Sequence, residues 1–335
     1  MLEWATRKAP EVTTNSAADQ VVAGHAAGGS AGVAHSASPH VHNRHDKSGI
    51  ALALGGGVAK GWAHIGVLRA LDEHKIPVRM IAGTSIGALV GGCYLAGKLD
   101  ELEEFARGLT KKRIFGLLDF HLGGNGLLGG LKLDQRLKAH LDNVTFADLP
   151  RPFVCVASEI RTGHEIWLSS GSLINAMRAS FALPGVFEPV VCNNRLLVDG
   201  ALVNPVPVSV CRAYEQMAVV AVNMHYDHFG RAAVVRHDAG PTVRDGQPNE
   251  MPRDAAMDRG RRLGITGTMV EAFNIIQDRI SRAKLAGDPP DLSLHPKLGH
   301  IGLTEFHKAD ELIQIGYDST VSKLEDIERL QRTYV

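Results

Sequence analysis

The stretch Ile81-Ala82-Gly83-Thr84-Ser85-Ile86-Gly87-Ala88-Leu89-Val90-Gly91-Gly92 decides how the rest of this chain is organised. It contains the pattern Gly-x-Ser-x-Gly, with an apolar run over Val78–Ala82 before it and small, helix-compatible residues after it. A serine on a sharp turn between a strand and a helix, called a nucleophile elbow, has this pattern and this setting. The turn needs small residues two positions before and after the serine, and Gly83 and Gly87 supply them. The stretch therefore predicts that the Ser85 hydroxyl stands above a sheet, near a helix N-terminus that favours negative charge.

A second glycine-rich segment lies upstream of this turn. The apolar run Ile50–Leu54 is typical of a strand buried in a parallel sheet, and it ends at Gly55-Gly56-Gly57-Val58-Ala59-Lys60-Gly61. A helix is expected from Trp62 to His74, before Pro77. Its apolar residues recur on one face, at Ile65, Leu68 and Leu71. Strand, loop, helix and strand together predict a βαβ unit, which is right-handed by default.

The glycine loop is open to several interpretations. A dinucleotide site also begins with a strand, glycines and a helix, but the G-x-G-x-x-G spacing fails, because the sixth residue from Gly55 is Lys60 and the third from Gly56 is Val58. A Walker A loop is excluded because Lys60 is followed by Gly61 and not by Ser or Thr. The remaining alternatives are a purely structural turn and an anion-binding loop. Beside a nucleophilic serine, the second of these would be an oxyanion hole made of backbone N–H groups.

The rest of the chain has the pattern of further strands and helices. Helices are predicted at residues 86–96, 100–110, 172–181, 264–286 and, for the most part, 304–332. Strands are predicted at residues 153–157, 165–168, 195–198, 219–223 and 292–294. The strand at 195–198 runs into Asp199-Gly200-Ala201, and an open α/β sheet places site residues at such strand ends. A plain turn at Asp199-Gly200 is the alternative.

Ser85 needs a base, because a free hydroxyl is a poor nucleophile at neutral pH. One alternative is a histidine late in the chain, and the candidates are His225, His228, His295, His300 and His307. The other is Asp199, which would accept the serine proton directly. A carboxylate is a weak base unless a partly dry pocket raises its pKa.

Four segments, in this order along the chain, resemble the patatin-like phospholipase family. They are Gly55–Gly61, Gly83–Gly87, Arg178–Val190 and Asp199–Ala201. The resemblance covers roughly residues 50–212, and four ordered motifs at sensible spacing make it specific. The segments Gln277-Asp278-Arg279 and Leu298–Gly302 resemble bacterial members of the family.

The resemblance implies a serine acyl hydrolase on a three-layer αβα sandwich with a Rossmann-like, mostly parallel sheet. Ser85 would attack the carbonyl of a phospholipid or lysophospholipid ester, Asp199 would take the serine proton, and water would release the acyl-enzyme. Its implied site residues comprise the oxyanion donors at Gly56, Gly57 and Val58, the loop residues Gly55, Lys60 and Gly61, the elbow glycines Gly83 and Gly87, and Gly200 and Ala201 beside the aspartate. No metal or cofactor is implied.

Two residues of the loop bear on this expectation. Lys60 matches a basic position of the family, which suggests either a contact with a lipid phosphate or a structural role. Val58 stands where many members have glycine, so the loop geometry departs from the family pattern at this point. The alternative function is a non-catalytic lipid-binding or regulatory protein with the same fold.

The partners expected from the sequence are a lipid ester substrate and, at most, the surface of a membrane. Residues 120–133 are glycine-rich and apolar, and could form a flap near the site. The helix at 264–286 places Met269, Phe273, Ile276 and Ile280 on one face, with arginines on the other, so it could lie on a membrane or pack on the domain. No run approaches the roughly 18 apolar residues of a membrane span, and no signal peptide begins the chain, which favours the cytoplasm with any membrane contact peripheral.

Composition sets the outer limits of these expectations. Formal net charge is zero, 44% of residues are hydrophobic and 21% are charged, so no basic surface calls for nucleic acid. Residues 1–48 are predicted to be a disordered low-complexity tail, 49–212 the catalytic core, and 213–335 a C-terminal part packed on it. The tail contains five histidines, at positions 25, 35, 40, 42 and 45, and a polar tail is favoured over a metal site. Buried free thiols are expected at all four cysteines, which are Cys93, Cys155, Cys192 and Cys211.

Overall fold

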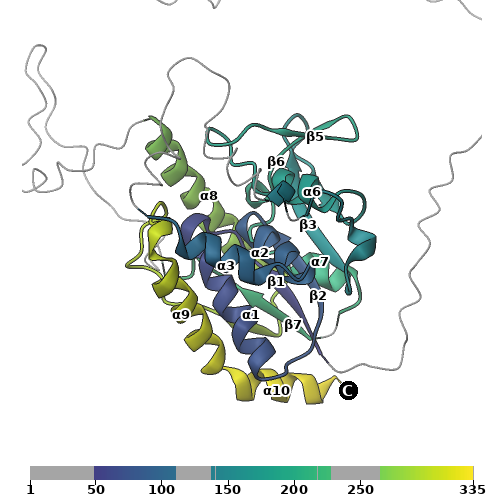
Figure 1. The fold of residues 1–335 in the computed structure, drawn as a ribbon, viewed down its shortest axis with the longest axis vertical. Coiled ribbons are helices and arrows are strands. Elements are labelled where there is room, and N and C mark those ends of the chain that lie inside the picture. The colour runs from purple at the N-terminus through teal and green to yellow at the C-terminus, as the bar shows by residue number, and fades with distance from the viewer. Residues whose placement is uncertain (1–48, 111–136, 140, 217, 228–264, 335) are drawn as a thin grey trace, which may run out of the picture. The chain divides into compact units, whose positions relative to one another are not determined.

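A mixed, mostly parallel sheet forms the centre of the molecule (Figure 1). The computed structural model describes residues 49–110, 137–139, 141–216, 218–227 and 265–334. Its strand order is β5-β6-β3-β2-β1-β7-β8, with β4 paired to β3 off this path. The strands are β1 (Ile50–Leu54), β2 (Val78–Thr84), β3 (Phe153–Glu159), β4 (Glu165–Leu168), β5 (Val190–Cys192), β6 (Arg195–Asp199), β7 (Val219–Val222) and β8 (Leu292–Leu294).

The central strands β1 and β7 are buried along their whole length, as their uninterrupted apolar sequences predict. β1 pairs in parallel with β2 and β7, and the other parallel pairs are β2 with β3 and β7 with β8. Along β1 the side chains alternate, so that Leu52 and Leu54 enter one core while Ala51 and Ala53 enter another. This alternation follows from the two-residue period of a strand. A sheet covered in this way needs helices on both faces.

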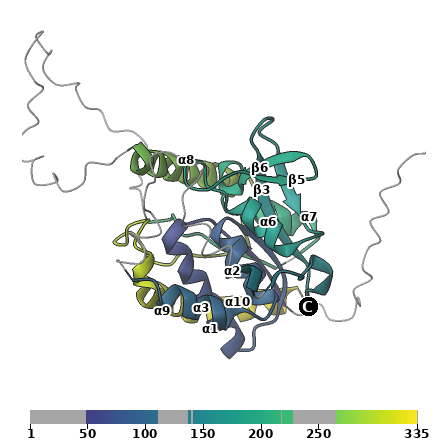
Figure 2. The ribbon, with the colours of Figure 1, turned by 45° about the horizontal axis from the view of Figure 1, so that its top comes forward.

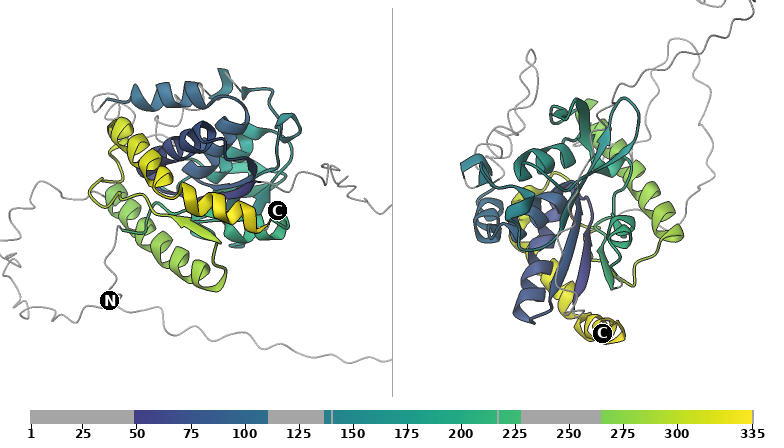
Figure 3. Two further views of the ribbon diagram at one scale, coloured as in Figure 1. Left: turned by 90° about the horizontal axis from the view of Figure 1, so that it is seen from below. Right: turned by 90° about the vertical axis from the view of Figure 1, so that its right-hand side faces the viewer.

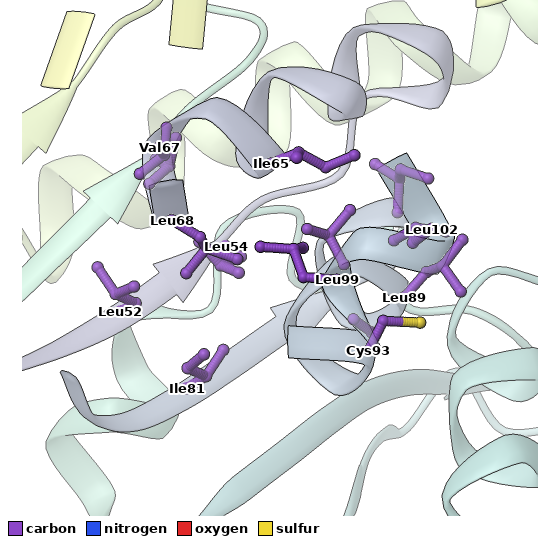
Figure 4. Packing of buried hydrophobic residues seen from close by; sticks show 14 of the residues in the cluster. Leu52, Leu54, Ile65, Val67, Leu68, Ile81, Leu89, Cys93, Leu99 and Leu102 are labelled. Carbon is purple, nitrogen blue, oxygen red and sulfur yellow. The ribbon is translucent and has the colours of Figure 1, made fainter. Parts of the chain in front are cut away.

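Most of the helices among the described residues lie on the face that Leu52 and Leu54 point to. They are α1 (Ala63–Glu73), α2 (Ile86–Leu95), α3 (Leu99–Arg107), α6 (Leu173–Ser180), α9 (Ala309–Val321) and α10 (Leu324–Thr333). Figure 4 shows Ile65 and Leu68 of α1 and Leu89 of α2 packed over the strand residues Leu54 and Ile81. The predicted apolar face of α1 is confirmed, because Ile65, Leu68 and Leu71 are all fully buried.

The opposite face carries α7 (Val208–Ala213) and α8 (Ile265–Gly287), and Figure 3 shows helices on both sides of the sheet. Val208, Val210 and Cys211 of α7 pack on Ala51, Ala53 and Met80, and Leu285 of α8 borders the same cluster. Helices on both faces of a mostly parallel sheet confirm the predicted three-layer αβα sandwich.

The sequence predicts an apolar face of helix α8 with Met269, Phe273, Ile276 and Ile280, and leaves open whether this face contacts a membrane or packs on the domain. Only Phe273 of these is buried, whereas the side chains of Met269 and Ile276 are 46% and 45% exposed. The side of the helix that faces the protein is largely polar and includes Asn274, Gln277, Asp278 and Ser281. The predicted apolar face is therefore divided, because Phe273 packs on Leu183 and Ala201 while Met269 and Ile276 stay largely exposed.

Some of the other predictions were confirmed and some were not. The short strand β5 and the helix α7 were not predicted, since three and six residues give too short a pattern. Three cysteines are buried as expected and Cys192 is half-buried, and none of the four forms a disulfide. The predicted tail at 1–48 and the predicted flap at 120–133 lie outside the described residues. None of the described helices is both long enough and apolar enough to cross a membrane.

Candidate active site

Strand register brings Ser85 and Asp199 together, although 114 positions separate them. β2 runs parallel to β3 and ends with Thr84 opposite Val156. β6 runs antiparallel to β3 and ends with Asp199 opposite Ala157, the next residue of β3. β2 and β6 lie on opposite sides of β3 and run in opposite directions, and their carboxyl ends reach neighbouring positions of β3. The residue after β2 and the last residue of β6 become neighbours in this way.

Ser85 sits on the predicted sharp turn between β2 and α2. Its φ of 57° and ψ of −125° form a left-handed conformation that a serine adopts only under constraint. The turn is too tight for side chains at the two glycines. A β-carbon on Gly83 would lie 2.5 Å from the Cα of Ala88, and one on Gly87 would lie 2.2 Å from the carbonyl oxygen of Leu54. Both glycines of the motif are thus required by close backbone approach.

The Ser85 hydroxyl donates a hydrogen bond of 2.6 Å from Oγ to Oδ2 of Asp199. The other carboxylate oxygen, Oδ1, accepts a 2.8 Å bond from the N–H of Ala201. The main-chain oxygen of Asp199 accepts a 2.9 Å bond from the hydroxyl of Ser158. The carboxylate is therefore fixed on both oxygens, with one of them directed at the serine.

Burial adjusts the chemistry of this pair. The side chain of Asp199 is 1% exposed and that of Ser85 is 8% exposed. Loss of hydration raises the pKa of Asp199 from 3.8 to about 7, although the hydrogen bonds from Ser85 and Ala201 oppose this rise. A carboxylate with a pKa near neutrality is a better proton acceptor than an ordinary aspartate. The pair can thus exchange a proton without a histidine.

Ser180, at the end of α6, supports the turn from behind. Its Oγ accepts a 2.9 Å bond from the N–H of Ser85 and donates a 2.6 Å bond to the carbonyl oxygen of Val156. The hydroxyl of Thr84 donates to the carbonyl oxygen of Asn204 at 2.8 Å. These buried hydroxyls hold the strained turn onto β3 and onto the segment after Asp199. No local sequence signal identified them, because their partners are distant in the chain.

The glycine loop lies against the same point. A β-carbon on Gly56 would stand 3.5 Å from the Cβ of Ser85 and 3.4 Å from that of Ala201. Of the three predicted oxyanion donors, the N–H of Gly56 donates to the carbonyl oxygen of Pro205 at 2.9 Å. The N–H groups of Gly57 and Val58 donate to no main-chain carbonyl within the described part of the chain. Of the three, Gly57 and Val58 thus have N–H groups with no main-chain acceptor among the described residues, whereas the N–H of Gly56 is already bonded.

Two further residues of the segment Val58–Trp62, a short 3-10 helix, bear on this loop. Val58 has a φ of 50°, a conformation that favours glycine and is unusual for a β-branched residue. Lys60 is fully buried, and this burial lowers the pKa of its ammonium group against the opposing charges of Asp227 and Glu271. Full burial favours the structural role of Lys60 over a contact with a lipid phosphate.

His64 of α1 holds the start of the loop. Its Nε2 lies 2.7 Å from the carbonyl oxygen of Gly55, so the ring donates from this nitrogen. Burial lowers the pKa of His64 to about 4, and the ring is neutral at physiological pH. A neutral, buried donor fixes the loop without adding charge to the site.

The serine hydroxyl donates to Asp199 and to none of the candidate histidines that lie among the described residues. His225 is buried just after β7, and the ring of His295 stacks on Tyr226 with centroids 3.9 Å apart. His300 pairs with Glu311 at 2.8 Å, and His307 lies in the short 3-10 helix Phe306–Lys308. His228 lies outside the described residues. Among the residues that are described, no three of His, Cys, Asp and Glu gather as a metal site would require.

Comparison with known proteins places this geometry in a family. Residues 52–212 match the model of the patatin-like phospholipase family, which spans the loop, the turn and the aspartate. An uncharacterized NTE family protein of Mycobacterium tuberculosis is 30% identical, over 83% of this chain and 92% of its own. The lysophospholipase NTE1 of Mycosarcoma maydis is 35% identical over 52% of this chain but only 10% of its own. A patatin-like phospholipase domain-containing protein of Caenorhabditis elegans is 35% identical over 52% of this chain and 13% of its own. The protein therefore belongs to the patatin-like phospholipase family.

Proposed function

We propose that the protein is a serine acyl hydrolase that cleaves lipid esters by means of a Ser85–Asp199 dyad. The observation that carries this proposal is the 2.6 Å hydrogen bond between Ser85 Oγ and Asp199 Oδ2 at a strained strand-to-helix turn. A serine held in this way is activated by an adjacent base, which is the general requirement for a hydroxyl nucleophile. Family membership supports ester hydrolysis as the reaction class.

The reaction would proceed in two steps. Ser85 Oγ attacks the ester carbonyl carbon while its proton passes to Asp199, and the N–H groups of Gly57 and Val58 stabilise the negative charge on the carbonyl oxygen. The alcohol leaves with the proton, and the acyl group stays on Ser85. Water then attacks the acyl-enzyme, releases the fatty acid and restores the serine. The substrates that we propose are phospholipids or lysophospholipids, in keeping with the names of the fungal and nematode relatives.

Labelling by a fluorophosphonate tests the activated serine. We expect intact mass to show one adduct on wild type, none on Ser85→Ala, and an unchanged adduct on the matched control Ser322→Ala, which removes an exposed hydroxyl. Fatty-acid release from phosphatidylcholine and lysophosphatidylcholine then tests the substrate class. Folded wild type that neither labels nor releases fatty acid, with or without vesicles, would favour the non-catalytic lipid-binding alternative.

The outer side of α8 supports a peripheral contact with membranes. Three of its large apolar side chains, Met269, Ile275 and Ile276, are 45–48% exposed, and Arg279 is exposed beside them. Apolar side chains flanked by arginine can enter the boundary of an anionic bilayer. Flotation with anionic vesicles should carry wild type upward and leave a variant with Met269→Ser, Ile275→Ser and Ile276→Ser behind. Equal behaviour of the two proteins would refute this contact.

A further inference from the structure

The inward side of α8 carries buried polar atoms that the dyad mechanism above does not use. Three oxygen atoms there have no hydrogen-bond partner among the described residues, and they belong to Asn274 (Oδ1), Gln277 (Oε1) and Ser281 (Oγ). Their positions differ by three and four residues, so they form one stripe along the helix. A buried oxygen without a protein partner costs about 1–3 kcal/mol unless water or a ligand donates to it. The three oxygen atoms can therefore accept hydrogen bonds from water or from a ligand.

Packing fixes this stripe over the active site. Phe273, one turn before Gln277, lies in a buried cluster with Ala201 and Leu183. Helix α8 packs on residues 200–202, which directly follow Asp199 (Figure 2). Toward its other end, Lys284 forms a 2.8 Å ion pair with Glu165, which in turn accepts a hydrogen bond from Asn204. The helix is thus anchored before and after Gln277.

Gln277 is the member of the stripe next to the dyad. Its side chain is 1% exposed. The position that a β-carbon on Gly56 would take is 3.1 Å from Gln277 Oε1 and 3.5 Å from Ser85 Cβ. Gln277 Oε1 and Ser85 Cβ therefore both lie next to the point where Gly56 lacks a side chain. Any side chain at position 56 would fill this space.

We propose that Gln277 orients the water that hydrolyses the acyl-enzyme. This inference rests on the proposed function. One water hydrogen is donated to Gln277 Oε1, and the other points to Asp199. The water oxygen attacks the acyl carbonyl carbon, and its second proton passes to the Asp199 carboxylate. The bond between the acyl carbon and Ser85 Oγ breaks, and the proton moves from Asp199 to Ser85 Oγ. The products are a carboxylic acid and free serine, so atoms and charge balance.

The unpaired atom favours this role over binding of the oxyanion. An oxygen without a partner accepts hydrogen bonds, and water supplies donors, whereas an oxyanion does not. Acylation does not require the water, so loss of Gln277 should slow only the second step. The two steps are separable in a pre-steady-state experiment.

The test uses p-nitrophenyl butyrate with wild type, Gln277→Met and Gln314→Met. The control makes the same substitution at an exposed position of α9. We expect the burst of p-nitrophenol from Gln277→Met to keep its rate, while the steady-state rate falls on the order of tenfold to a hundredfold. Intact mass should show the butyryl adduct persisting longer in this variant than in the other two proteins once the substrate is consumed.

Other outcomes would overturn the proposal. Equal slowing of burst and steady state would assign the carboxamide to the oxyanion site, and a lower melting temperature with an unchanged ratio of the two rates would assign it to packing. Wild type that releases no p-nitrophenol would refute the proposed function itself, and the inference with it. Wild type that turns over, with Gln277→Met deacylating equally fast, would refute the inference alone.

Discussion

Asp199→Asn is the substitution whose effect follows most directly from the geometry. Asparagine has the shape of aspartate, so Oδ1 can still accept from the N–H of Ala201, and the new amide can donate to Ser85 Oγ. The variant loses the proton acceptor of the dyad. We expect ester hydrolysis to fall by about 10²- to 10⁴-fold, the usual contribution of a general base.

The same substitution should stabilise the fold at high pH. The pKa of Asp199 is 3.8 as a free group and about 7 in the folded protein. Between these values the native state holds a proton that the unfolded state has released, so wild-type stability falls as pH rises through this window. At 1.36 kcal/mol per pKa unit, the ionised carboxylate costs the native state about 4 kcal/mol above pH 7. The neutral amide does not titrate and escapes this cost.

Urea unfolding of both proteins at pH 5 and pH 8 measures this effect. The free energy of unfolding of Asp199→Asn, relative to wild type, should rise by about 3 kcal/mol between the two pH values. Other titrating groups are common to both proteins and cancel in this difference. A difference that stays constant within about 0.5 kcal/mol would show that the pKa of Asp199 is not raised, and the argument for a base without histidine would fail.

Three further predictions concern the same site. Because the carboxylate is the active form, kcat/KM for p-nitrophenyl butyrate should increase tenfold per pH unit below about 7 and level off above it; a profile flat from pH 5 to 8 would contradict this. Gly87→Ala should destabilise the fold by about 2–3 kcal/mol and abolish hydrolysis, because its β-carbon would lie 2.2 Å from the carbonyl oxygen of Leu54. The control Gly287→Ala, whose β-carbon meets no atom within 4 Å, should leave thermal unfolding and ester hydrolysis unchanged. Val58→Gly should be more stable than Val58→Ala by about 0.5–1 kcal/mol, since glycine relieves the φ of 50° that alanine retains; the reverse order in urea unfolding would argue against strain in the loop.

Several parts of the site were predictable because their causes are local. A tight strand-to-helix turn needs glycines at fixed spacing from the serine, so the spacing of Gly83, Ser85 and Gly87 predicts the turn. A strand buried on both faces needs an uninterrupted apolar run, so β1 is predicted to the residue. The motif around Asp199 could be singled out because it ends such a run.

Other parts depend on contacts that no local pattern encodes. The apolar period of α8 was visible, but which of its residues are buried depends on the segments that it packs on, and these bring Gln277 close to Ser85. In the sequence, the N–H of Gly56 is as good a candidate oxyanion donor as those of Gly57 and Val58. In the structure it donates to the carbonyl oxygen of Pro205. In each case the deciding partner is distant in the sequence.

The sequence by itself determined the βαβ unit, the sharp turn at Ser85 and the candidate carboxylate, because periodicity and steric limits on small residues act over a few neighbouring positions. The αβα sandwich was implied by the resemblance to the family. Only the tertiary structure decided that Asp199, and not a histidine, receives the hydrogen bond of Ser85. That choice depends on β6 running antiparallel to β3, so that its end meets the end of β2 one register position away. The raised pKa of Asp199 was decided in the same way, since it follows from water excluded by residues gathered from across the chain.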